Sequence, residues 1–291
     1  MNAELGIGRF AANPFRKDGR ALVSKVAADR RDLKGNILKA VGLIGGFSKV
    51  VEKGDEIWLK PNFNTSDPPP GSSDPEFVKA VIELLFEHGA SRVILGESSM
   101  LSLSTSKVLK ETGMLEKAEE AGAEVVVFDE GEWKAVNTGG KYLETVSLPE
   151  TALKAKKLVY VCCMKTHRFA KFTLSLKLAV GFMKPRERVA LHLRHLEEKV
   201  ADLNLVVHPD LIIMDGRTCF ISGGPASGEL RNPHVVLASG DRIAIDLEAL
   251  KIIESFENSS LTDDPWSYTQ IRKAGELGIG VKKDDGYNVV E

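Results

Sequence analysis

The sequence predicts an α/β fold, a mostly parallel sheet with helices on both faces and a mixed extension in the second half. Short apolar runs rich in β-branched residues alternate with longer segments in which apolar residues recur at helical spacing. That alternation is typical of βαβ units, whose strands are parallel. Hydrophobic residues make up 43% of the 291 residues, which is enough for a large core. The length allows two lobes, a Rossmann-like lobe over 1–150 and a second α/β lobe over 151–291.

Charge and cysteine content limit the classes of function. The net charge is −2, so neither nucleic acid nor a membrane is an expected partner. Three cysteines, an odd and sparse set, are typical of a reducing compartment. The sequence has no Cys-x-x-Cys motif, hence no zinc ribbon and no iron–sulfur cluster motif. Because no apolar run reaches signal-peptide or membrane-spanning length, we expect a cytoplasmic protein.

The first half is expected to place polar side chains at one edge of the sheet. Its expected elements are a strand near 21–26, a helix over 33–44, a strand over 56–59, a helix from about 74 to 89, a strand over 92–95, helical pieces within 103–121 and a strand over 125–128. Lys60 and Glu97 each follow a strand of one βαβ unit, so both should lie at the carboxyl edge. The proline-rich loop 65–71 is either a connector or a wall over the pocket that Lys60 faces.

The second half is expected to add further strands and helices. The expected elements are a hairpin or excursion over 129–145, a short strand over 144–148, a helix over 150–156, a strand over 158–163, helices over 171–183 and 186–206, strands over 210–214 and 234–237, a helix over 243–255, a last helix beginning at 263–265 and an edge strand in the tail.

Residues 156–184 carry the strongest functional pattern. The apolar run 158–163 ends in a polar segment at the strand's carboxyl end, where open α/β sheets bind ligands. Lys177 lies inside an otherwise apolar segment, where a lysine must either reach water or meet an anion. The cationic residues of this stretch are Lys165, His167, Arg168, Lys171 and Lys177. They indicate a pocket for a carboxylate, a phosphate or a similar anion, and the alternative is a solvated basic loop followed by a core helix.

Two further patterns are compatible with a metal or a general base. Asp215 follows the strand 210–214, a common place for either role, and its alternative is a turn aspartate before Gly216. His192 and His195 lie one helical turn apart and could hold a divalent metal, or they could be ordinary solvent-facing histidines.

The remaining candidates surround a glycine-rich segment, 223–228. It lacks the Gly-Lys-Ser/Thr ending of a phosphate-binding loop and leads into a strand, so nucleotide binding is weakly supported, although the backbone around Gly224 could wrap a small ligand. Asp241 can cap the helix that follows it. Asp246 stands among apolar neighbours and needs a partner if it is buried.

Several segments taken together resemble a known bacterial and archaeal family. They are Lys60-Pro61-Asn62, Glu87-His88-Gly89-Ala90 with Val93–Glu97, Met164-Lys165-Thr166-His167, Ser175-Leu176-Lys177 with Gly181, Asp215-Gly216, Gly224-Pro225 with Gly228, and Ser239, Asp241 and Asp246. This ordered set resembles the family called domain of unknown function 362 over roughly residues 50–285, which implies a single family domain. Some members look fused to ferredoxin-type segments, and this chain lacks that cysteine run. Members typically have Lys-Asn where this chain has Lys177-Leu178.

Two hypotheses of function follow. The first is an enzyme that binds a small anionic substrate or cofactor, with metal assistance as an option. Its catalytic residues would be Lys165, His167 and Asp215, and its binding residues Lys60, Asn62, Lys177, Gly224, Asp241 and Asp246. The second is a non-catalytic accessory protein that carries a metal or cofactor for a redox partner. The substrate, the metal and the formation of a homodimer stay open at this point.

Overall fold

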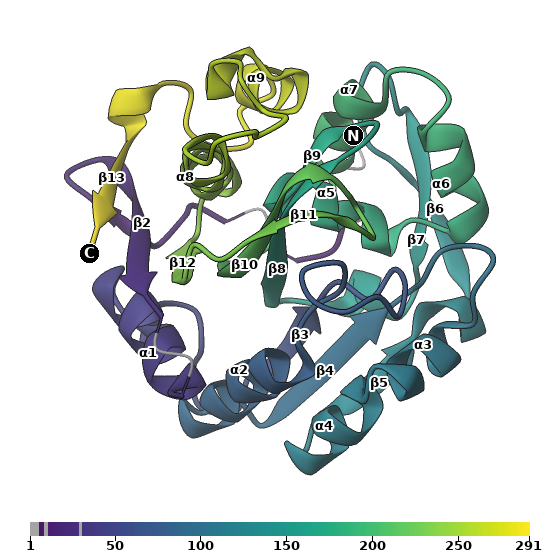
Figure 1. Ribbon diagram of the computed structural model, residues 1–291. Helices are drawn as coiled ribbons and strands as arrows, with labels where there is room; N and C mark the ends of the chain where they lie inside the picture. The colour runs from purple at the N-terminus through teal and green to yellow at the C-terminus, as the bar shows by residue number, and fades with distance from the viewer. Residues whose placement is uncertain (1–5, 9–10, 29–30) are drawn as a thin grey trace.

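A computed structural model describes residues 6–8, 11–28 and 31–291, and one sheet runs through it (Figure 1). The sheet has eleven strands, and its main path is β1-β2-β12-β10-β8-β3-β4-β5. Along this path the strands are β1 (Arg16–Lys17), β2 (Arg20–Ala27), β12 (Val235–Ser239), β10 (Leu211–Gly223), β8 (Leu158–His167), β3 (Glu56–Lys60), β4 (Arg92–Glu97) and β5 (Glu124–Val127). At its sides, β9 (Lys171–Thr173) pairs with β8, β11 (Gly228–Arg231) with β10, and β13 (Tyr287–Val290) with β2. A separate hairpin consists of β6 (Trp133–Asn137) and β7 (Thr145–Pro149).

Most of the sheet is parallel, as the sequence predicts. The neighbouring pairs among β10, β8, β3, β4 and β5 are all parallel. The mixed part lies in the later strands, because β12 runs antiparallel to both of its neighbours and β9 and β11 fold back on β8 and β10. The expected strands at β2, β3, β4 and β12 are confirmed, and of the two alternatives after β5, a hairpin or an excursion, the structure has the hairpin.

Helices cover both faces of the sheet (Figure 1). On one face lie α1 (Leu33–Leu43), α2 (Pro75–Glu87), α3 (Thr105–Glu111) and α4 (Met114–Glu120). On the other lie α5 (Ser175–Leu178), α7 (Leu196–Leu203), α8 (Arg242–Glu254) and α9 (Thr269–Glu276), with α6 (Pro185–Leu191) beside the β6–β7 hairpin. Short 3₁₀ turns are η1 (Phe47–Lys49), η2 (Phe128–Glu130), η3 (Ala152–Lys154), η4 (Ala179–Phe182), η5 (Pro265–Ser267) and η6 (Asp284–Gly286).

The two faces bury two separate apolar clusters because side chains alternate along each strand. Trp58 and Tyr160 belong to the cluster that contains residues of α5, α7 and α8, whereas their neighbours Leu59 and Val159 belong to the cluster that contains residues of α1 and α2. This two-sided burial explains why the strand sequences are continuous apolar runs rather than alternating patterns.

The segment after the central strand differs from the sequence prediction. The strand expected over 158–163 continues to His167, because β9 pairs with its end and forms a hairpin. The helix expected over 171–183 is wrong, since this segment contains β9, α5 and η4. Residues 174–180 are all buried, so the spacing of their apolar side chains carries no information about which face points inward.

Other predicted elements also have different bounds. The helix expected over 186–206 is two helices, α6 and α7, and His195 between them has a left-handed φ of 53°. The strand expected over 210–214 extends to Gly223, because β11 pairs with its far end. The helix expected over 150–156 is only the 3₁₀ turn η3.

The sheet includes strands from both sides of residue 150, since β8 lies between β10 and β3, and β2 pairs with β12. The division into two lobes stays a prediction. Among the described residues, no helix combines the length and the apolar character needed to cross a membrane.

Candidate functional site

A cavity of about 630 Å³ lies at the carboxyl ends of β3, β4 and β8. Six of the candidate catalytic, binding and metal residues line it: Lys60, Asn62, Lys165, His167, Lys177 and His192. The proline-rich loop contributes Thr65 and Gly71 to the lining. The interpretation of that loop as a wall of the pocket is therefore the one that fits the structure.

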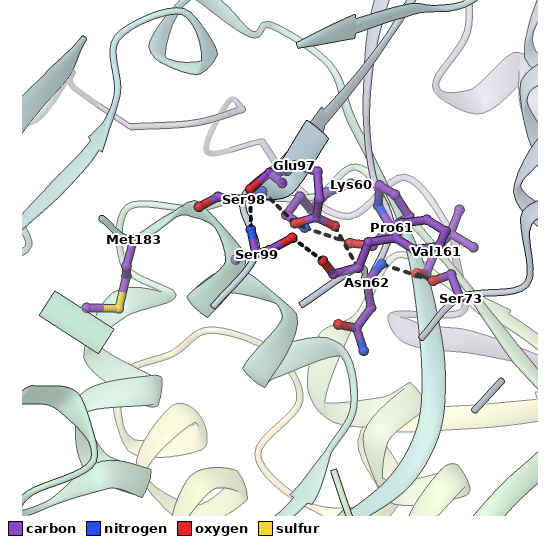
Figure 2. Close-up of polar contacts among 12 residues, drawn as sticks. Lys60, Pro61, Asn62, Ser73, Glu97, Ser98, Ser99, Val161 and Met183 are labelled. Carbon is purple, nitrogen blue, oxygen red and sulfur yellow. Dashed lines mark hydrogen bonds and ion pairs between the residues drawn. The ribbon is translucent and has the colours of Figure 1, made fainter. Parts of the chain in front are cut away.

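An ion pair at the ends of β3 and β4 forms one side of the cavity. Lys60 and Glu97 point toward one another in Figure 2, with Lys60 Nζ 2.5 Å from Glu97 Oε1 and both side chains 1% exposed. Glu97 also accepts hydrogen bonds from the backbone N–H groups of Phe63 and Ser98, both at 2.8 Å. Both of its carboxylate oxygens thus accept from donors in the described structure. The shared carboxyl edge that the βαβ pattern predicts is confirmed.

The β8–β9 hairpin supplies three side chains from one face. Lys165 and His167 are two residues apart on β8, and Thr173 on β9 pairs with Lys165, so all three project the same way. The Lys165 ammonium donates to the carbonyl oxygen of Gly71, and burial lowers its pKa. The hydroxyl of Thr173 is buried and has no hydrogen-bond partner among the described residues.

Lys177 lies on α5, a four-residue helix whose start is held by a buried carboxylate. Asp246 on α8 accepts hydrogen bonds from the backbone N–H groups of Ser175 at 2.8 Å and Leu176 at 3.0 Å. The expectation that a buried Asp246 needs a partner is thus met by backbone amides. Burial, together with the charges of Lys165 and Arg188, lowers the pKa of Lys177 to about 7. No carboxylate within the described part of the chain forms an ion pair with it.

Arg188, on α6, is a buried cation. Its guanidinium donates to four carbonyl oxygens, those of Gly181, Met183, Ser98 and Ser99, at 2.8–3.1 Å. It thereby ties α6 to the end of β4. Burial lowers its pKa to about 10.

Two histidine rings lie face to face in the cavity wall, and their hydrogen bonds fix their tautomers. The ring centroids of His167 and His192 are 6.0 Å apart. Nδ1 of His167 accepts from the N–H groups of Phe169 and Ala170, both at 3.1 Å, so its proton is on Nε2. Nδ1 of His192 lies 2.7 Å from the carbonyl oxygen of Arg188 and must donate, which leaves its Nε2 unprotonated.

Burial favours the neutral form of both rings. Burial lowers the pKa of His167 to about 2, helped by the charge of Lys177, and burial also lowers the pKa of His192. The pair therefore presents one N–H donor and one basic nitrogen within a single wall of the cavity.

A family model described as "Domain of unknown function (DUF362)" matches residues 57–251. The chain belongs to this family. The expected resemblance is thus confirmed, and the match contains Lys60, Glu97, Lys165, His167, Lys177, Arg188 and His192. A relative is the thylakoid-associated protein sll1697 of Synechocystis sp., 25% identical over 219 residues, which are 72% of this chain and 67% of that protein.

The three aspartates expected in the site of this DUF362 chain lie outside the cavity lining. Asp215 is not at a strand end, because β10 continues past it, and its carboxylate binds Arg217 at 2.6 Å. Asp241 caps α8 by accepting from Ile243 and Ala244, as expected for a cap. Asp246 holds α5 and so acts on the cavity only through that helix.

The structure also brings only one of the two expected histidines, and only part of the glycine-rich segment, into the cavity lining. His195 is exposed, lies 3.4 Å from Glu198 and is not part of the cavity lining, whereas His192 is. The described residues contain no group of three or more His, Cys, Asp or Glu side chains that could hold a metal ion. Pro225 and Ala226 line the cavity, whereas Gly224 packs on β8, where an added Cβ would lie 2.0 Å from the carbonyl oxygen of Thr166.

Sequence reasoning missed three side chains of the DUF362 cavity. Glu97 was placed at the correct edge but not recognised as the partner of Lys60. Arg188 and Thr173 carried no signal, because an arginine on a polar helix and a threonine in an apolar run are ordinary patterns. The strand alternation from Lys165 would have identified Thr173 only if the hairpin had been known.

Proposed function

We propose that the cavity binds an organic anion and that the protein is an enzyme that transfers a proton on it. The observation that carries the proposal is the set of buried cations in its wall. Lys165, Lys177 and Arg188 have no ion-pair partner within 4.0 Å among the described residues, although each is at most 8% exposed. An unpaired buried charge is unfavourable, and a bound carboxylate or phosphate would supply the missing partner.

The histidine pair supports proton transfer on such a ligand. His192 would take a proton at its free Nε2, and His167 would donate one from Nε2, with their tautomers held by the backbone. In this proposal the histidines take the role expected of Asp215, which lies outside the lining. Glu97, the carboxylate in the described lining, is already paired with Lys60. The lysines would hold the anionic group while the proton moves.

Titration calorimetry with inorganic phosphate and with acetate tests this proposal. We expect Lys165→Met and Lys177→Met each to weaken binding of the preferred anion by roughly tenfold to a hundredfold, because a charged hydrogen bond is worth about 1.5–3 kcal/mol. Lys283→Met is the matched control, since Lys283 is 75% exposed and lies outside the cavity. Unchanged affinity for the anion in both cavity variants would contradict the proposal.

A second candidate is an accessory protein that carries an anionic cofactor, with or without a metal, for a redox partner. The engagement of Glu97 by three donors is compatible with this role, because a carrier needs no free base among the carboxylates of its site. Stoichiometric ligand retained through purification, combined with no exchange of ligand protons in deuterated water, would favour this candidate over the enzyme.

A cytoplasmic location is likewise a proposal. Its support is chemical: Cys162, Cys163 and Cys219 are all unpaired and buried, as in proteins of reducing compartments. The thylakoid association belongs to the name of the relative.

A further inference from the structure

Exposed apolar side chains gather at the mouth of the cavity. The described part of the chain has ten large apolar side chains that are exposed, and five of them line this one cavity. They come from three segments that are far apart in sequence: Met100 and Leu101 after β4, Phe169 between β8 and β9, and Val189 and Leu193 on and after α6. Scattered exposed apolar residues are ordinary, but a cluster around a single opening marks a binding surface.

The polarity of the cavity changes from its floor to its mouth. Lys60 and Lys165, at most 2% exposed, belong to the floor, whereas Phe169 and Leu193 at the mouth are 70% and 76% exposed. A ligand that fills the cavity would meet cations at one end and apolar side chains at the other.

The size of the cavity also exceeds that of a bare anion. A volume of about 630 Å³ is in the range of sites that enclose drug-sized ligands. Phosphate or acetate would occupy a small part of it and would leave the apolar mouth exposed. The buried Thr173 hydroxyl, which has no partner within the described residues, offers one more polar contact in the interior.

We propose that the ligand is an amphiphilic anion, a molecule whose carboxylate or phosphate meets the lysines and whose apolar chain or ring lies against the mouth. This inference rests on the proposed function and names the chemical class of its ligand. Phe169 and Leu193 would then determine specificity, because their exposed apolar surface would be covered only when the apolar part of the ligand is bound.

The test is a homologous series of alkyl phosphates and alkyl carboxylates, measured by titration calorimetry below the concentration at which they form micelles. Each buried methylene strengthens binding roughly fourfold, so octyl phosphate would bind roughly fiftyfold or more tightly than ethyl phosphate if half of the added methylenes are covered. In Phe169→Ser with Leu193→Ser, we expect this ratio to fall by roughly tenfold while the affinity for inorganic phosphate is unchanged. Leu230→Ser, at an exposed apolar position outside the cavity, is the control and should keep the full ratio.

The outcomes separate this inference from the proposed function. Equal affinity for short and long chains, with inorganic phosphate still bound in a lysine-dependent way, would overturn the amphiphile and leave the anion site intact. Binding to vesicles that contain phosphatidic acid, without binding to monomeric octyl phosphate, would also overturn it and would assign the apolar mouth to a membrane surface. If no anion of either series binds, the proposed function fails as well.

Discussion

At the scale of single residues, Lys177 is the side chain with the most unusual environment. It is buried, it has no carboxylate partner among the described residues, and the nearby Lys165 and Arg188 repel its charge. Arg168 and Lys171, which belong to the same cationic stretch of sequence, are exposed instead. The cationic cluster that the sequence indicates is therefore divided by the hairpin, with Lys165, His167 and Lys177 inside and the other two in solvent.

The unligated protein should become more stable as the pH rises above 7, through Lys177. Its pKa is about 7 in the folded state and about 10.5 in the unfolded chain, so between these values the unfolded state binds the extra proton. The free energy of unfolding should then rise with pH by up to ~1.4 kcal/mol per pH unit. Urea unfolding of wild type and Lys177→Met between pH 7 and 10 measures the difference. A slope that is the same in both proteins would contradict this account.

At the scale of elements, the position of Lys177 depends on a contact between two helices. A four-residue helix cannot hold itself in place, and Asp246 on α8 fixes the first turn of α5 through two backbone N–H groups. Gly181 gives Lys60 the room it needs, because an added Cβ there would lie 2.6 Å from Lys60 Cε. Asp246 and Gly181 therefore position the cations and contribute no charged group to the cavity floor.

Replacement of Asp246 should disturb both stability and ligand binding. We expect Asp246→Ala to lower the free energy of unfolding by about 2–5 kcal/mol, because two buried N–H groups lose their acceptor, and to weaken anion binding by at least roughly tenfold. Asp241→Ala is a matched comparison, since Asp241 is another buried carboxylate that accepts backbone N–H groups at the start of a helix. It should destabilise the protein and leave the anion affinity of the folded fraction unchanged. Loss of affinity in both variants would show that the effect is general and not transmitted through α5.

At the scale of the whole molecule, one sheet joins the two halves of the chain. The central strand β8 pairs with β3 from the first half and β10 from the second, and β2 pairs with β12. A cut near residue 150 would separate both sets of partners. The cavity likewise takes side chains from both halves, with Lys60 and Glu97 from one and Lys165, Lys177 and Arg188 from the other.

This topology predicts a single cooperative unfolding transition. The three tryptophans report on both halves, Trp58 and Trp133 before residue 150 and Trp266 after it. In variants that keep only Trp58 or only Trp266, with phenylalanine at the other two positions, the urea midpoints should coincide with each other and with the loss of far-ultraviolet circular dichroism. A separate midpoint for Trp266 would instead support two lobes that fold independently.

The sequence alone determined the fold class and the edge of the sheet at which polar residues gather. Strand-length apolar runs and helical spacing are local patterns, and the rule that parallel strands end at one edge brings Lys60, Glu97 and Lys165 together without coordinates. The membership of the family was also predictable from the sequence, since the resemblance depends on the order of the motifs alone.

Only the tertiary structure decided which charges are buried and what each of them meets. Arg188 donates to a carbonyl oxygen that follows β4, 90 residues away in sequence, and to another in η4, and His195 lies outside the cavity lining because α6 and α7 are separate helices. Asp215, Asp241 and Asp246 found partners elsewhere, in an arginine and in backbone amides. Burial and pairing depend on contacts between segments that are distant in sequence, and the spacing of residues along a chain does not predict these contacts.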